Sequence, residues 1–259
     1  MNDIKSIIDV HAHLGYDYIF DHDFTREDLL YNLEHQNVVK TIVQPALARF
    51  YMDDVKLYHD NIADLCREYP GSFYGMASVS PHFRPEDLSF ELSRCINDLG
   101  FIAIKLTPIG HACSPSSKDG MFLFSEAKKL KVPLMVHTGA GAPFSSPAAL
   151  IAPLEKYPDI TVIVAHAGSE QFAAEARQLC IYPNVYYDAS WLGSLSTRRL
   201  IDAAGAERIL FATDHADNLP TELAKYKSIC KSSELTKALY KNALNLFDFR
   251  RNLTERKKI

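Results

Sequence analysis

Residues 7–13 have the sequence Ile-Ile-Asp-Val-His-Ala-His, a short apolar run that ends in two histidines. Runs of the same kind recur seven times along the chain, at 41–46, 73–79, 102–108, 133–139, 161–168, 185–191 and 209–216. Several of them are apolar on both faces, as strands are when helices cover a parallel sheet on each side. The run at 7–13 is therefore predicted to be the first of eight parallel strands.

The intervals between these strands have the apolar spacing of helices. By subtraction, successive strands start between 24 and 34 residues apart, which leaves room for one helix and two loops. Apolar residues three and four apart mark helices at 54–69, 87–99, 122–130, 148–157, 170–179 and 197–204. Regular alternation predicts an α/β fold, a single-domain (β/α)8 TIM barrel over residues 1–249, with an open doubly wound sheet as the alternative. Residues 250–259 are polar and basic and are predicted to form a frayed tail.

Two segments between strands lack a helical pattern. Residues 109–120 and 140–147 are rich in Gly, Ser and Pro, and each follows the end of a predicted strand. The carboxyl ends of barrel strands are where enzymes of this architecture place their chemistry. These two loops are therefore expected to border a site.

Composition excludes several classes of protein. The chain has 259 residues, 47% of them hydrophobic, and a net charge of -4, whereas a nucleic-acid partner would favour a strongly basic balance. No apolar run reaches transmembrane length, and the N-terminal residues are not expected to act as a secretory signal. The five cysteines are widely spaced without a C-x-x-C pair, a pattern typical of reduced thiols in a cytoplasmic protein.

Histidines lie on the first predicted strand with a spacing of two. Side chains alternate across a strand, so His11 and His13 are expected to point to the same face, with Asp9 one step deeper on that face. Imidazole is the commonest metal ligand near neutral pH. The pair therefore offers two metal ligands at the mouth of a barrel.

Three other strands end in a side chain that can bind a metal. His137 ends strand 133–139, His166 ends strand 161–168, and Asp214 ends strand 209–216. In a closed barrel these ends converge on one central spot. Three or four nitrogen and oxygen ligands with an open position are typical of a catalytic metal site.

These motifs resemble those of the amidohydrolase superfamily, in particular amidohydrolase family 2. The matching pieces run in order through nearly the whole chain: Ile-Asp-Val-His-Ala-His at 8–13, Ile-Lys-Leu-Thr-Pro at 104–108, Val-His-Thr-Gly at 136–139, Ala-His-Ala-Gly at 165–168, Pro-Asn-Val-Tyr-Tyr-Asp-Ala-Ser at 183–190, Arg-Ile-Leu-Phe-Ala-Thr-Asp at 208–214 and Asn-Ala-Leu-Asn-Leu-Phe at 242–247. The resemblance implies that His11, His13, His137 and Asp214 are metal ligands. His166 would be either a ligand of a second metal or an acid/base above a single one.

The resemblance also implies a divalent metal, one ion or two. Zinc is the first choice, and manganese and iron remain open because ligand softness alone does not choose among them. The chain departs from the family after the last strand. Many relatives have Tyr or Trp and then Pro after the aspartate, whereas residues 212–216 here are Ala-Thr-Asp-His-Ala. His215 is expected to point away from Asp214, as a loop residue.

Four other side chains are candidates at the site. Lys105 ends strand 102–108, either as an ammonium that pairs with Asp9 or an anionic substrate, or as a carboxylated ligand of a second metal. Arg49 is a candidate for binding a substrate carboxylate. Trp191 and Tyr187 are candidates for the pocket wall, although packing is the commoner role of such aromatics. The other histidines are expected on the surface or in loops: His22, His35, His59, His82 and His111.

The predicted activity is hydrolysis of an amide, lactone or ester bond in a small molecule by metal-activated water. Asp214 would act as the base and His166 would stabilise developing charge or assist proton transfer. One alternative is non-oxidative decarboxylation of an aromatic or dienoic acid, in which Arg49 would matter more. The other alternative is a protein with the same barrel fold that serves as a binding subunit and has no catalytic activity. A homodimer is expected by analogy alone.

Overall fold

The computed structural model describes residues 6–18, 20–46, 51–141 and 143–251. Its strands are β1 (Ile7–Asp17), β2 (His22–Phe24), β3 (Val38–Pro45), β4 (Phe73–Ser78), β5 (Ala103–Leu106), β6 (Leu134–His137), β7 (Val162–Ala165), β8 (Val185–Asp188) and β9 (Ile209–Leu210). Its α-helices are α1 (Arg26–His35), α2 (Met52–Glu68), α3 (Pro85–Ser93), α4 (Pro108–His111), α5 (Lys118–Leu130), α6 (Ile151–Lys156), α7 (Ser169–Gln178), α8 (Ser194–Ala204), α9 (Leu219–Ile229), α10 (Ser232–Thr236) and α11 (Asn242–Leu246).

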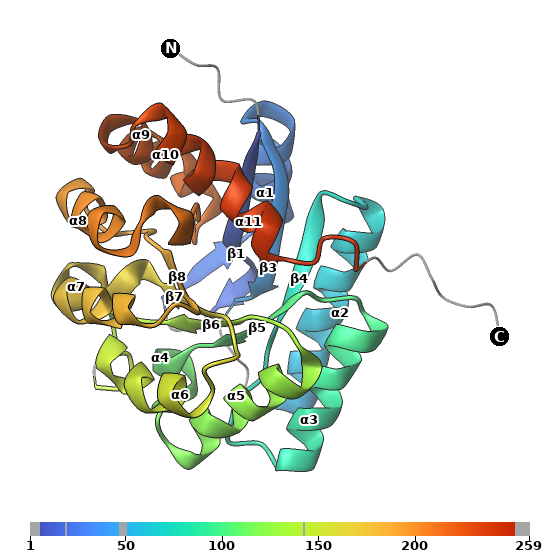
Figure 1. Ribbon diagram of the computed structural model, residues 1–259. Coiled ribbons are helices and arrows are strands. Elements are labelled where there is room, and N and C mark those ends of the chain that lie inside the picture. The colour runs from blue at the N-terminus through green and yellow to red at the C-terminus, as the bar shows by residue number, and fades with distance from the viewer. Residues whose placement is uncertain (1–5, 19, 47–50, 142, 252–259) are drawn as a thin grey trace.

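The nine strands form one curled sheet with helices around it (Figure 1). The order is β2-β1-β3-β4-β5-β6-β7-β8-β9, and every neighbouring pair is parallel except β1 and β2. A doubly wound sheet would reverse its strand order at a switch point, whereas the parallel strands here follow chain order from β1 through β3 to β9. The predicted α/β class is confirmed, and the curled sheet fits an α/β barrel.

The two ends of the parallel sheet approach each other. Val10 N donates to Phe211 O at 3.1 Å, and Asp214 N donates to His11 O at 2.8 Å. Ala12 and Asp214 form an isolated parallel bridge. These contacts join β1 to the segment that follows β9, and they bring the first and last site residues of the sequence together.

Two groups of buried apolar residues follow from this arrangement. The smaller group combines side chains of β1 and β3–β7 with Leu210, Ala212, Ala243 of α11 and Phe247, which directly follows that helix. The larger group lies between the sheet and the helices around it. Strands that are apolar on both faces serve both groups, which explains why the sequence of β7 contains no polar residue.

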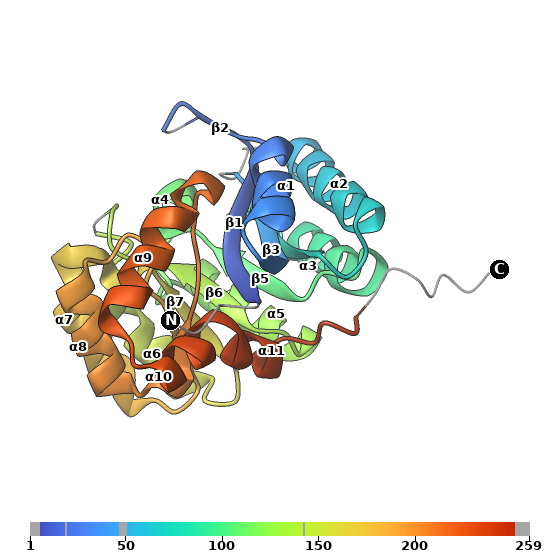
Figure 2. The same ribbon diagram turned by 90° about the horizontal axis from the view of Figure 1, so that it is seen from above.

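Strand β1 departs from regular pairing between Asp9 and Ala12. Ile8 and Val10, which precede or lie within this irregularity, belong to the smaller apolar group. Beyond it, β1 continues to Asp17 and pairs with β2 in a hairpin that projects past the helices (Figure 2). The irregularity changes which side chains of β1 face the site.

The segment at 109–120 is more ordered than its sequence predicts. It contains the short helix α4 and the start of α5, whose N-cap Ser117 accepts a hydrogen bond from Gly120 N at 3.0 Å. The Gly-, Ser- and Pro-rich composition reflects this cap and turn chemistry. In the described residues, no helix has the length and apolar character that crossing a membrane requires.

His59 and His111, predicted to lie on the surface or in loops, are buried. His59 of α2 receives the Ser78 amide proton on Nε2 at 3.0 Å, so its Nδ1 carries a hydrogen and donates to Glu91 of α3 at 2.7 Å. Arg94 binds both oxygens of Glu91 at 2.8 Å. Burial alone would raise the pKa of Glu91, but the bonds from His59 and Arg94 outweigh it and lower it to about 2.

This carboxylate makes a testable contribution to stability. We expect Glu91→Gln to cost about 3 kcal/mol at pH 7, because it removes one partner of a buried ion pair. The folded-state pKa of Glu91 is depressed, so the contribution is complete above about 4.5, its ordinary value, and is lost as the pH falls toward about 2. Urea unfolding of wild type and variant between pH 7 and pH 3 measures this, with the exposed Glu86→Gln on the same helix as the control. A free-energy difference that does not shrink at low pH would contradict the assignment.

Candidate metal centre

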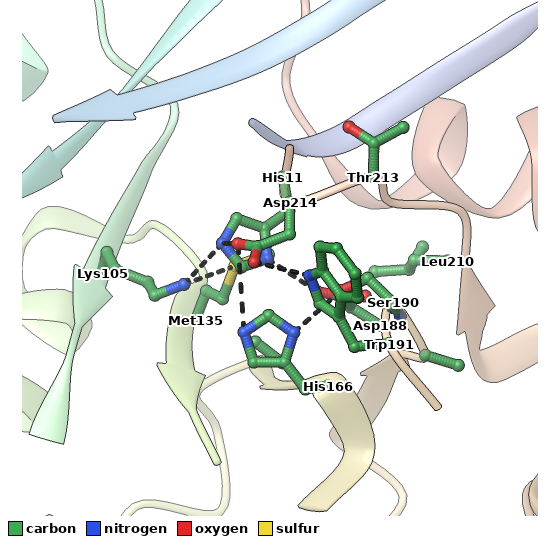
Figure 3. A network of polar contacts seen from close by, with 12 residues as sticks. His11, Lys105, Met135, His166, Asp188, Ser190, Trp191, Leu210, Thr213 and Asp214 are labelled. Carbon is green, nitrogen blue, oxygen red and sulfur yellow. Dashed lines mark hydrogen bonds and ion pairs between the residues drawn. The ribbon is translucent and has the colours of Figure 1, made fainter. Parts of the chain in front are cut away.

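The five predicted ligands lie on four strands of the sheet or shortly after them. His11 and His13 lie on β1, His137 is the last residue of β6, and His166 directly follows β7. Asp214 follows β9 at the bridge to β1. Figure 3 shows several of these side chains pointing toward one another.

The carboxylate of Asp214 is the centre of the cluster. Its Oδ1 lies 3.1 Å from Nε2 of both His11 and His13, and 4.0 Å from Nε2 of His166. The two Nε2 atoms of His11 and His13 are 3.3 Å apart. His11, His166 and Asp214 each offer a ligand atom within 4.8 Å of the others. The structure thus brings four of the five predicted residues into one donor set.

Outer hydrogen bonds determine which ring nitrogens are free. His11 Nδ1 lies 2.7 Å from an oxygen of Asp188, and His13 Nδ1 lies 3.2 Å from the carbonyl of Pro45. The Pro45 oxygen is a backbone carbonyl and carries no hydrogen. Asp188 is ionised, because burial raises its pKa less than the hydrogen bonds from His11 and Ser190 lower it. Both Nδ1 atoms must therefore donate, so in the neutral form of each ring the lone pair lies on Nε2.

This arrangement fits a divalent cation. Nε2 of His11, Nε2 of His13 and Oδ1 of Asp214 lie within 3.3 Å of one another and are all atoms that bind cations. In the free site, Lys105 lies 2.8 Å from the first nitrogen and Gln44 lies 3.1 Å from the second. Two nitrogen ligands of a tetrahedral zinc ion, each ~2.0 Å from it, would lie roughly 3.3 Å apart. Three histidines and one aspartate are a donor set for zinc, manganese or iron.

His137 stands beside this set. Its ring packs edge-on against His166 with centroids 4.8 Å apart, and its Nε2 lies 2.9 Å from the carbonyl of Ala140. Because that carbonyl only accepts, Nε2 carries the hydrogen and Nδ1 holds the lone pair. Any metal ligand atom of His137 is therefore Nδ1, in contrast to His11 and His13.

Burial keeps the imidazoles in the neutral form that binds metals. It lowers the pKa of His11 and of His137 to about 3, and it also lowers the pKa of His166. Burial alone would raise the pKa of Asp214, but the neighbouring His166, His11 and His13 hold it well below its usual range. The free site therefore has neutral rings at His11, His137 and His166 and an ionised carboxylate at Asp214.

Lys105 is fully enclosed beside this site. Its Nζ lies 2.8 Å from His11 Nε2 and 3.6 Å from the sulfur of Met135. Burial lowers the pKa of Lys105 to about 8. The expected pairing with Asp9 is not found, because Asp9 accepts hydrogen bonds from the Thr213 hydroxyl at 2.6 Å and amide at 3.1 Å. The irregularity of β1 accounts for this, since it separates Asp9 from the face that carries His11.

Asp188 has a clear role that the sequence analysis missed. It ends β8 and bonds to His11 Nδ1, while its other oxygen accepts from Ser190 N at 2.7 Å. The hydroxyl of Ser190 in turn lies 2.9 Å from His166 Nδ1. The signal was present, because Val-Tyr-Tyr-Asp is an apolar strand ending in a carboxylate, like the strand before Asp214.

We expect Asp188→Asn to weaken binding of zinc by about 10- to 100-fold, because the His11 ring loses the acceptor that fixes its tautomer. Calorimetric titration of the metal-free protein measures the affinity. Asp159→Asn, at a side chain that is 75% exposed, is the matched control. Equal affinities for wild type and Asp188→Asn would remove Asp188 from the site.

His215 differs from its prediction. Its Nε2 lies 3.7 Å from Asp214 Oδ2, so it does not point away from that carboxylate. Its ring stacks on His22 with centroids 4.9 Å apart and meets Phe24 edge-on at 4.7 Å. Strand β2 therefore brings His22, which the sequence placed on the surface, to the border of the site.

The three remaining candidates, Trp191, Tyr187 and Arg49, differ in their positions relative to the site. Trp191 is 49% exposed, and its Nε1 donates to Asp214 Oδ2 at 2.8 Å. Tyr187 is buried in packing, with its hydroxyl on Ala176 O at 3.3 Å, and is no pocket wall. Arg49 lies outside the described residues.

Comparison with known proteins supports these assignments of fold and family. The chain is 23% identical to the gamma-resorcylate decarboxylase of Rhizobium sp. (strain MTP-10005), over 60% of this chain and 63% of that protein. It therefore matches somewhat less than two thirds of that relative's length.

Solved structures show the same fold. A 2,6-dihydroxybenzoate decarboxylase in complex with 2,6-dihydroxybenzoate superposes with a TM-score of 0.78 at 18% identity, covering 95% of this chain and 100% of that one. The 5-carboxyvanillate decarboxylase of Novosphingobium aromaticivorans, in complex with manganese and 4-hydroxy-3-methoxy-5-nitrobenzoic acid, has a TM-score of 0.77 at 16% identity, covering 96% and 97%. The model of the amidohydrolase family matches residues 8–249, and the chain therefore belongs to that family.

Proposed function

We propose that this protein is a metal-dependent, non-oxidative decarboxylase of a small hydroxylated aromatic acid, on a single-domain (β/α)8 barrel. The relatives favour this alternative over hydrolysis of an amide, lactone or ester, which was the first prediction from the sequence and stays a prediction. The family resemblance supports His11, His13, His137 and Asp214 as the ligands of one ion, with His137 binding through Nδ1. His166, which lies in one donor set with His11 and Asp214, is proposed as an acid/base above that ion or as a ligand of a second one. Zinc and manganese both suit the donor set, and a manganese complex is known for one similar structure.

The observation that carries the proposal is the buried ammonium of Lys105 beside the cluster. The charged side chains that contact the His11 ring are Lys105, Asp188 and Asp214. A divalent cation added to these three leaves one net positive charge in an enclosed site. Such a site favours an anionic substrate such as a carboxylate over a neutral amide or ester.

Gln44 supports a hydroxyl group on the substrate. Its side chain is 1% exposed, and its Nε2 lies 3.1 Å from His13 Nε2, where it donates to the ring's lone pair. Its Oε1 is buried and has no hydrogen-bond partner among the described residues. A buried acceptor of this kind requires a donor, and a substrate hydroxyl supplies one.

The chain's own groups suffice for the proton transfer. A divalent cation in the site would polarise the carboxylate and hydroxyl oxygens of the substrate. Asp214, ionised in the free protein, accepts the proton of a hydroxyl ortho to the carboxylate and passes it to the ring carbon that bears this carboxylate. The carbon–carbon bond then breaks, its electron pair restores the aromatic ring, and carbon dioxide and a phenolate leave.

Incubation of zinc- or manganese-loaded protein with 2,6-dihydroxybenzoate and with 5-carboxyvanillate tests the proposal. The expected result is release of carbon dioxide, with deuterium at the former carboxyl carbon when the solvent is heavy water. A panel of aryl esters, lactones and amides is assayed in parallel. Hydrolysis of that panel without any release of carbon dioxide would overturn the proposal in favour of the hydrolase.

A further inference from the structure

The two oxygens of Asp214 have different partners. Oδ1 faces the imidazoles of His11 and His13 at 3.1 Å. Oδ2 accepts the Nε1 hydrogen of Trp191 at 2.8 Å (Figure 3). Nε2 of His215 lies 3.7 Å from the same oxygen. The indole thus occupies the oxygen that does not face the donor set.

Burial does not explain the position of Trp191. The residue is 49% exposed, so it gains only part of the hydrophobic stabilisation available to an indole. Its backbone has φ 62°, a left-handed conformation that non-glycine residues adopt rarely and at a cost. Surrounding contacts must hold this conformation in place.

Helix α9 supplies those contacts. Glu222, 3% exposed, accepts the backbone hydrogen of Trp191 at 3.0 Å. Lys225 pairs with Glu222 at 2.5 Å and donates to the carbonyls of Ala189 at 2.6 Å and Leu192 at 2.9 Å. Glu222 and Lys225, one helical turn apart, therefore hold the backbone in place both at Trp191 and on either side of it.

We infer that Trp191 is a positioning residue that sets the orientation of the Asp214 carboxylate, and that Glu222 and Lys225 of α9 hold Trp191 in place for this. The bond to Oδ2 restricts rotation of the carboxylate and keeps Oδ1 directed at the imidazoles. The inference rests on the metal site of the proposed function but on no particular reaction.

A role in positioning and a role in the pocket wall have different consequences. A wall residue affects KM for the substrate and leaves metal affinity unchanged. A residue that orients a ligand changes metal affinity in the absence of any substrate, typically by about 10- to 100-fold.

Trp191→Phe keeps an aromatic ring and removes the N–H donor. We expect calorimetric titration with zinc to give an affinity at least tenfold weaker than that of wild type. Tyr31→Phe on α1 is the matched control, because it also removes a polar group from an aromatic ring that is 55% exposed. Wild-type affinity in Trp191→Phe would overturn the inference, whereas failure of the wild type itself to bind zinc would overturn the metal site.

The indole also provides a direct spectroscopic signal, because Trp191 is the single tryptophan of the chain. Zinc should shift or quench the emission of the wild type, with a midpoint equal to the calorimetric one. In Asp214→Asn, at a concentration that calorimetry shows to be saturating, the change should be largely lost. An emission spectrum that saturating zinc leaves unchanged in the wild type would show that the indole does not sense Asp214.

Discussion

Replacing Asp214 by Asn is expected to lower kcat for decarboxylation by about a thousandfold at saturating metal. An amide has the shape of the carboxylate but accepts no proton at neutral pH, so the transfer from hydroxyl to ring carbon loses its carrier. The neighbouring imidazoles hold the pKa of Asp214 well below its usual range against the effect of burial, which keeps the group ionised and able to accept. Steady-state assays with metal-saturated protein measure the loss.

The control for this variant is Asp202→Asn on α8, where the side chain is 65% exposed. Circular dichroism and a thermal midpoint near that of wild type would show that Asp214→Asn remains folded. Retention of more than about a tenth of wild-type kcat would exclude Asp214 as the proton carrier, and His166 would then be the next group to test.

The sequence predicts that the candidate ligands lie close together because strand ends converge for topological reasons. An apolar strand that ends in a histidine or aspartate places that side chain at the rim of the sheet, whatever the loops do. His166 and Asp214 were identified in this way. They are far apart in the chain, but in the structure His166 Nε2 lies 4.0 Å from Asp214 Oδ1. The same rule applied to Val-Tyr-Tyr-Asp would have found Asp188.

Features that depend on local backbone irregularity were not predictable from alternation. Asp9 was predicted to lie on the same face of β1 as His11. The break in the pairing of β1 places Asp9 on another face, where its carboxylate accepts a hydrogen bond from Thr213. His215 was assigned away from Asp214 on the assumption of an extended backbone. Asp214 has φ 63°, in the left-handed region, so the assumption fails at the residue that matters.

Three residues of the site share this unusual backbone. His166 has φ 60°, Trp191 has φ 62° and Asp214 has φ 63°, and each follows a strand of the sheet. Such conformations cost of order 1–3 kcal/mol each for residues other than glycine and persist only where surrounding contacts enforce them. Asp214 and two residues that lie close to it, His166 and Trp191, thus share this conformation, which indicates that the fold maintains this geometry at the expense of stability.

Lys105→Met is the second variant with a large expected effect. It keeps the length of the side chain and removes the buried charge, so kcat/KM for a carboxylate substrate should fall about a hundredfold, the loss of one charge-assisted hydrogen bond. Affinity for zinc should rise several-fold, because the ammonium no longer competes for the lone pair of His11 Nε2, 2.8 Å away. The thermal midpoint should not fall, since burial of the ammonium outweighs its attraction to Asp214 and Asp188, and an apolar group of similar volume replaces it.

The opposite directions of these effects make the test specific. A general disturbance of the site would weaken the binding of both metal and substrate. The Lys105 ammonium, in contrast, weakens the binding of the metal and strengthens the binding of the anionic substrate. Lys118→Met, at an exposed position on α5, is the control for loss of a lysine. If Lys105→Met binds zinc more weakly than wild type, or converts the carboxylate substrate with unchanged kcat/KM, then Lys105 does not supply the positive charge on which the choice of an anionic substrate depends.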